Sequence, residues 1–77
     1  NKNNPMALFT ATVKSTRLVN GIRLEKGMSV EFTSAFSAPL STNGGIEVIQ
    51  AFQRKYGVDI KKAAAVSSAY IEVVKVN

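Results

Sequence analysis

Side chains that could act as acids, bases or nucleophiles are few in this sequence, and their spacing does not favour catalysis. The 77 residues include no histidine and no cysteine, which excludes an imidazole base, a thiol nucleophile and the usual zinc sites. The carboxylates are scattered singly, so no spacing predicts a catalytic pair; they are Glu25, Glu31, Glu47, Asp59 and Glu72. No Ser-x-x-Lys arrangement supplies a base for a serine. We therefore expect no enzymatic activity, no catalytic residue, no metal site and no cofactor.

A glycine pair in the stretch TNGGIE, residues 42–47, is the feature nearest to a phosphate cradle. Free N–H groups at the start of a helix can bind an anion. The stretch lacks the Lys-Ser/Thr of a Walker loop and the third glycine of a dinucleotide fingerprint, and Glu47 would repel an anion there. We favour a structural interpretation, in which Thr42 or Asn43 caps the helix that follows.

Basic residues give the chain its clearest functional signal. Ten lysines and arginines against five acids leave a net charge of +5, which attracts polyanions such as nucleic acid. Six of them fall in three groups, on an expected hairpin, at an expected helix end and just beyond it: Arg17, Arg23, Arg54, Lys55, Lys61 and Lys62. These six predict a stripe of phosphate contacts, with Lys14, Lys26 and Lys75 at its margins. Nucleic acid is the first partner we expect, and ordinary solvated surface charge is the alternative.

A second hypothesis comes from the loop at residues 33–43, TSAFSAPLSTN, which is longer than most connections and has no clear period. Phe36, Pro39 and Leu40 are its candidate contacts with a protein partner. The edge of a small open sheet can also pair with another strand, and a domain of this size often gains stability by forming a homo-oligomer. The rival interpretation is a structural or protein-interaction module that associates with itself through a sheet edge.

Alternating residues predict the strands that must position these side chains. In LFTATVKS, residues 8–15, apolar and polar residues alternate as in a half-buried strand. Asn20 and Gly21 suit a type I′ hairpin turn, whose flanking residues lie opposite each other. Gly27 predicts a tight turn or a glycine bulge that leads into a third strand at residues 28–32.

Apolar residues at three- and four-residue spacing predict an amphipathic helix over residues 46–56. Gly57 suits the left-handed conformation that ends a helix. Beyond it, Asp59 can cap a short second helix through IKKAAAV, residues 60–66. The final strand, which begins near Ala69, has apolar residues on both faces, and this indicates a central or doubly covered position.

These elements predict one α+β domain over residues 6–77, preceded by a disordered leader or processed end at residues 1–5. We expect a small bent antiparallel sheet of order β-β-β-α-β, in which the last strand returns beside the first. We favour closure into an SH3-like barrel, and the alternative is an open four-stranded sheet with one helix. The longest apolar-leaning run, residues 63–71, is far shorter than the roughly 20 residues that span a bilayer, so we expect no membrane association.

The segments MALFTATVKSTRLVNGIRLEKGMSVEF, NGG and FQRKYGVDIKKA resemble a family of small uncharacterised proteins, a domain of unknown function, from Bacteroides-type gut bacteria. The resemblance covers residues 6–76 and implies a bacterial, cytoplasmic protein, in the setting of a mobile element. Its motifs are turns, a helix stop and core alternation, so it supplies no functional residue. The Lys-Gly-Met-x-Val stretch is also similar to the turn-to-strand element of many SH3-like barrels, a pattern shared by nucleic-acid readers and scaffolds.

Overall fold

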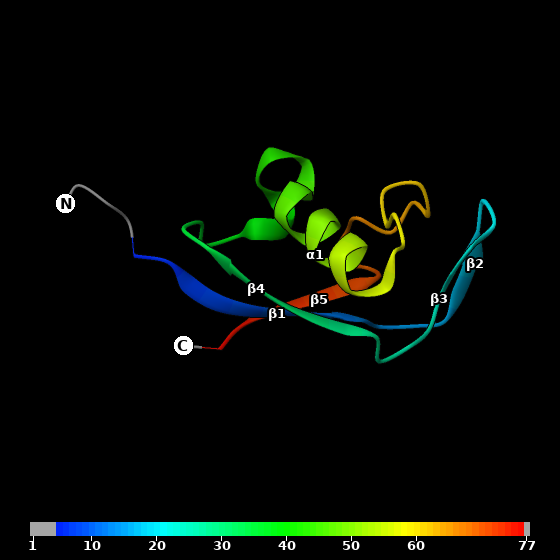
Figure 1. Ribbon diagram of the computed structural model, residues 1–77, viewed down its shortest axis with the longest axis horizontal. Coiled ribbons are helices and arrows are strands. Elements are labelled where there is room, and N and C mark those ends of the chain that lie inside the picture. Colours follow the sequence, from blue (N-terminus) through cyan, green and yellow to red (C-terminus); the bar gives the residue numbers. More distant parts are fainter. Residues whose placement is uncertain (1–4, 77) are drawn as a thin grey trace.

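The computed structural model describes residues 5–76, which form an α+β fold of two small sheets and one helix (Figure 1). The predicted leader at residues 1–5 lies outside the described part except for Pro5. Two short 3-10 turns, η1 (Pro39–Ser41) and η2 (Asn43–Gly45), precede the helix. The main elements are β1 (Ala7–Val13), β2 (Arg17–Val19), β3 (Ile22–Leu24), β4 (Ser29–Ser34), α1 (Ile46–Tyr56) and β5 (Ile71–Lys75).

The larger sheet has the antiparallel order β4-β1-β5, so the last strand lies beside the first, as predicted. The favoured SH3-like barrel is wrong, because the described strands form no closed barrel. β4 and β5 lie on opposite sides of β1 and do not meet, while β2 and β3 pair only with each other. The predicted central position of the last strand is also wrong, since β5 lies at an edge and β1 is the central strand.

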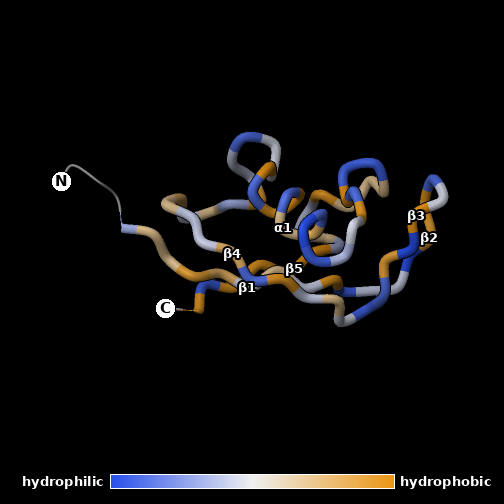
Figure 2. Tube along the Cα trace, viewed as in Figure 1, coloured by the Kyte–Doolittle hydropathy of each residue, from blue (hydrophilic) through white to orange (hydrophobic). Residues whose placement is uncertain are grey.

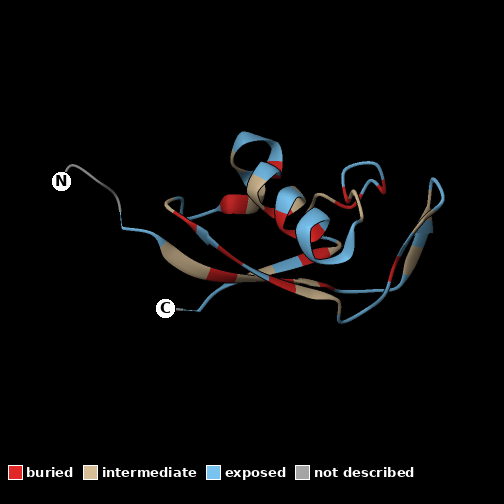
Figure 3. Cartoon of the chain, viewed as in Figure 1, coloured by how far each residue is buried: buried red, intermediate tan, exposed pale blue. Residues whose placement is uncertain are grey.

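Helix α1 covers one face of the larger sheet, and the core lies between them (Figure 1). Phe9, opposite Phe32 in the register, stacks on it with ring centroids 5.7 Å apart. From the helix, Phe52 and Val48 are fully buried. Figure 3 shows the buried positions where α1 lies over the sheet, and Figure 2 shows hydrophobic stretches along β1 and β5 beneath it. The alternation read from the sequence therefore identifies the covered face correctly.

The β2–β3 hairpin continues the β1–β4 ladder after an interruption of four residues on each strand. Asn20 (φ 52°) and Gly21 (φ 78°) have the positive φ values of the predicted type I′ turn. At the interruption, the Gly27 N–H donates to the Val13 carbonyl at 2.9 Å, and the Val13 N–H donates to the Met28 carbonyl at 2.8 Å. Gly27 and Met28 thus lie opposite the single residue Val13, and Gly27 has a φ of 94°. This arrangement is the predicted glycine bulge. Such a bulge bends a ribbon, and Figure 1 shows the hairpin turned up toward the helix side of the sheet.

Helix α1 ends as predicted but begins differently. Gly57 is left-handed (φ 69°), and its N–H donates to the Gln53 carbonyl at 2.9 Å. At the start, the predicted caps are wrong, because Gly45 is the N-cap residue and no side chain caps the helix. The Thr42 hydroxyl donates instead to the Ala38 carbonyl at 2.7 Å, within the preceding turn.

The predicted second helix is also wrong, since residues 60–64 form turns and residues 65–66 have no regular structure. The Asp59 carboxylate accepts from the N–H groups of Lys61 at 3.0 Å and Lys62 at 3.2 Å, as a cap would. Ala64 then adopts a left-handed conformation (φ 55°), which interrupts the helical path before a second turn can form.

Replacing Ala64 with glycine should stabilise the fold, because a left-handed conformation costs an alanine side chain about 1–2 kcal/mol and costs glycine little. The greater freedom of glycine in the unfolded chain offsets part of this gain, so we expect a net increase of about 0.5 kcal/mol in unfolding free energy. Urea denaturation followed by circular dichroism measures it. A loss of stability equal to that of Ala69→Gly, a control outside any regular helix or strand, would contradict the interpretation.

Candidate nucleic-acid interface

The β2–β3 hairpin packs against the segment formed by residues 57–66. The Asn20 side-chain amide donates to the Lys62 carbonyl at 2.8 Å, and Arg17 Nη1 donates to the Ala64 carbonyl at 3.2 Å. On the hairpin Leu24 is fully buried, as is Ile60 on the segment. The contact brings four of the six predicted phosphate-binding residues to one end of the molecule. We call them the basic end: Arg17, Arg23, Lys61 and Lys62.

Arg17 has a structural role within the basic end. Its guanidinium carbon lies 3.6 Å from the centre of the Tyr70 ring, and the side chain is half-buried. The ring and the Ala64 carbonyl fix the guanidinium between the hairpin and the segment. Arg17 therefore contributes positive charge at a set position, while Tyr70 has one ring face covered and is poorly placed to stack on a base.

The other three cations of the basic end are exposed. Arg23 lies opposite Leu18 on the outer face of the hairpin and forms an ion pair with Glu25. Among the described residues, the side chains of Lys61 and Lys62 make no hydrogen bond or ion pair. Their ammonium groups therefore face water and remain available to a phosphate.

Arg54 and Lys55, the remaining predicted contacts, lie beside β4. Arg54 lines a shallow hollow beside β4 together with Glu47. The Lys55 ammonium donates to the Ser29 carbonyl at 2.7 Å and lies 5.3 Å from the centre of the Tyr56 ring. The structure thus divides the predicted stripe, because α1 directs its basic residues toward β4 and not toward the hairpin.

The candidate protein-contact residues are placed unequally by the loop between β4 and α1. Phe36 is exposed, Leu40 is half-buried, and Pro39 is fully buried and is not accessible to a partner. The loop begins at a contact that the sequence did not suggest: the buried Ser34 hydroxyl donates to Glu47 Oε1 at 2.6 Å. The same oxygen of Ser34 accepts from the Phe36 N–H at 3.0 Å. The Glu47 carboxylate therefore positions the start of the loop.

Two general features complete the description of residues 5–76. Within this range, no group of three or more acidic residues lies close enough together to hold a metal ion. None of the helices in the described part of the chain is both long enough and apolar enough to cross a membrane.

Comparison with known proteins finds one protein family. Its model, described as a family of unknown function (DUF6140), matches residues 6–73. No curated protein and no solved structure matches the chain.

Proposed function

We propose that this chain, which belongs to the DUF6140 family of proteins of unknown function, binds nucleic acid through its basic end. The observation that carries the proposal is the docking of the hairpin on the segment 57–66, because it gathers cations that are far apart in the sequence. Two acidic residues lie beside these cations: Glu25 directly follows β3, and Asp59 belongs to the segment 57–66. A concentration of positive charge at one end attracts a polyanion far better than the same charge spread evenly.

The chemistry supports phosphate contacts and not reading of the base sequence. Lys61 and Lys62 are exposed ammonium groups on a turn, and these bind phosphates as point charges. The apolar Leu18 side chain, 66% exposed beside Arg23, is placed to contact a sugar or a base. We therefore expect binding that depends strongly on salt and weakly on sequence.

Neutralising the two exposed lysines tests the proposal. The double variant Lys61→Gln/Lys62→Gln should weaken binding to a labelled oligonucleotide about tenfold near 50 mM salt and lower the slope of log K against log salt by about 2. Fluorescence anisotropy with single- and double-stranded oligonucleotides, at about 50 mM and about 200 mM salt, measures both quantities.

The matched control for this experiment is Arg54→Gln/Lys75→Gln, which removes the same net charge away from the basic end. It should change the affinity less than about twofold. Equal losses in the two double variants would show that only net charge matters. Absence of binding at low salt in the unmodified protein would overturn the proposal outright, and tight binding to anionic lipid vesicles alone would redirect it to a membrane surface.

We further infer that the protein works in a bacterial cytoplasm, as the resemblance to proteins of Bacteroides-type gut bacteria implies. Nucleic acid is a polyanion present in that compartment, and the net charge of +5 attracts the chain to it.

A further inference from the structure

The two outer strands of the larger sheet differ in how their free edges are covered. At the β4 edge, the Ser29 N–H donates to the Tyr56 hydroxyl oxygen at 3.1 Å, and the Ser29 carbonyl accepts from the Lys55 ammonium. Side chains of α1 thus occupy the outward backbone groups of Ser29, the first residue of β4. At the β5 edge, no strand of residues 5–76 pairs with the outer side of the backbone.

The backbone groups that β5 presents outward follow from its pairing with β1. The Lys14 N–H donates to the Tyr70 carbonyl at 2.9 Å, and the Val76 N–H donates to the Leu8 carbonyl at 2.7 Å. Since such bonds alternate along an antiparallel strand, the N–H and C=O groups of Val73 and Lys75 point away from β1. These four groups are spaced to pair with one extended chain.

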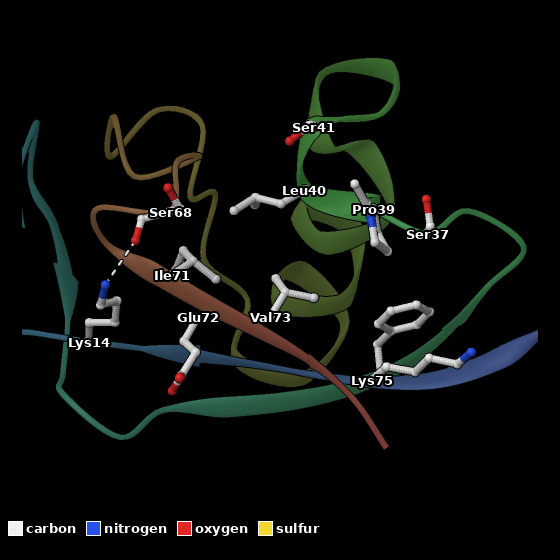
Figure 4. Close-up of a pocket in the computed structure, with 12 residues that line it drawn as sticks. Lys14, Ser37, Pro39, Leu40, Ser41, Ser68, Ile71, Glu72, Val73 and Lys75 are labelled. Atoms are coloured by element: carbon white, nitrogen blue, oxygen red, sulfur yellow. Dashed lines mark hydrogen bonds between the residues drawn. The ribbon is translucent and has the colours of Figure 1, made fainter. Parts of the chain in front are cut away.

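A groove of about 440 Å³ runs along this edge, between β5 and η1 (Figure 4). Leu40, Ile71 and Val73 point into it and give it an apolar lining. Side chains of a strand added to β5 would point into the groove at every second residue, because side chains alternate between the two faces of a sheet. The edge therefore offers backbone hydrogen bonds together with an apolar slot, as in proteins that bind peptides by adding a strand.

Lysines mark the two ends of the groove. Lys14 is held at one end, where its ammonium donates to the Ser68 carbonyl at 3.0 Å, and Lys75 lies at the other end (Figure 4). Glu72, the one acid beside the groove, points away from it in the same view. The groove is thus apolar in the middle and positive at both ends.

We infer that β5 binds an extended segment of another protein, with small apolar residues at alternate positions and an acidic residue on each side of them. The apolar residues would contact Leu40 and Val73, and the acidic ones would lie near Lys14 and Lys75. Charge favours this occupant over a second copy of the chain, since each copy has a net charge of +5 and would bring a further Lys75 to the same edge.

A short acidic probe tests the inference. The N-acetylated, C-amidated peptide Glu-Thr-Val-Thr-Val-Thr-Glu should bind at least about tenfold more tightly than Lys-Thr-Val-Thr-Val-Thr-Lys in low salt, because only its ends complement the two lysines. Fluorescence polarisation gives the two affinities. In ¹⁵N spectra, the acidic peptide should shift the amide signals of Val73 and Lys75 and slow their hydrogen exchange. These outward N–H groups are the ones that would become bonded.

Three protein variants test whether the peptide binds at the β5 edge. Lys75→Glu is an exposed substitution that should remove most of the preference for the acidic peptide, because the groove then has one positive and one negative end. Val73→Pro removes an outward N–H and should abolish binding while the β1–β5 ladder persists. Val74→Thr, on the opposite face, should bind as the unmodified chain does.

Four results would overturn the inference. The first is equal binding of the two peptides, and the second is unchanged Val73 and Lys75 signals at saturating acidic peptide. The third is a concentration-dependent dimer with protected Val73 and Lys75 amides in the absence of peptide, which would make a second copy the occupant. An unchanged peptide preference in the folded Lys75→Glu variant would equally contradict it.

Discussion

Replacing Phe52 with alanine lowers the free energy of unfolding by about 3–5 kcal/mol. The ring is fully buried between α1 and the sheet, and its centre lies 6.1 Å from the centre of the Tyr56 ring. Its removal loses the transfer free energy of the ring and leaves a cavity that a close-packed core fills only in part. A domain of this length has a total stability of roughly 4–12 kcal/mol, so the variant should be at or near the limit of folding.

Denaturant unfolding measured by circular dichroism provides the test for Phe52, with Phe36→Ala as the matched control. The same atoms are removed at Phe36, but that ring is 42% exposed on the loop before α1. The control should therefore lose less than about 1 kcal/mol. Similar losses for the two variants would show that Phe52 does not lie at the centre of the core.

The second large effect is expected at Gly45, where alanine should lower the unfolding free energy by about 2–4 kcal/mol. A Cβ at this position would lie 2.7 Å from Val66 Cγ1 and 2.9 Å from the Leu40 carbonyl oxygen. The carbonyl is part of the backbone and cannot move aside without shifting η1. The left-handed φ of 76° adds the ordinary penalty for a side chain in that conformation.

The neighbouring Gly44 separates the two causes of this effect. Its φ is 67°, yet a Cβ there would meet nothing within 4 Å. Gly44→Ala should therefore show the conformational penalty alone, about 1 kcal/mol, and the difference between the variants measures the steric overlap. Adding Val66→Ala to Gly45→Ala should recover part of that difference, and the absence of any recovery would argue against a close approach of Gly45 and Val66.

Local signals in the sequence predicted the elements that depend on local geometry. Asn20-Gly21 and Gly57 specify turns that only residues tolerant of positive φ adopt readily, and both occur where expected. The start of α1 could not be read in this way. The Thr42 hydroxyl donates to the Ala38 carbonyl and so does not cap the helix. This bond depends on a turn that has no clear signal in the sequence.

The position of β5 shows why sheet topology is harder to predict from one sequence. Val74 and Val76 are about half exposed on the uncovered face of the sheet, yet a strand with apolar residues on both faces is typical of a buried position. A strand is buried on both faces only when other elements cover both faces of its sheet. Here α1 covers one face of the larger sheet.

Residues of the candidate interface were predicted by type, but their grouping was not. The bond from Arg17 to the Ala64 carbonyl joins residues 47 positions apart, and no periodicity encodes such a contact. Arg54 and Lys55 are adjacent to each other and close in sequence to Lys61, yet α1 directs them elsewhere. Proximity in the chain was therefore a poor guide to proximity on the surface.

The unequal covering of the two sheet edges limits the stoichiometry of any assembly that grows by strand pairing. With both edges open, each added molecule would present a new edge, and chains of indefinite length could form. Here Lys55 and Tyr56 occupy the backbone groups of Ser29, so a strand that approaches β4 loses its first pairing position. The fold thus makes β4 a poorer template for a further strand than β5, and this difference disfavours the repeated edge-to-edge pairing that builds fibres.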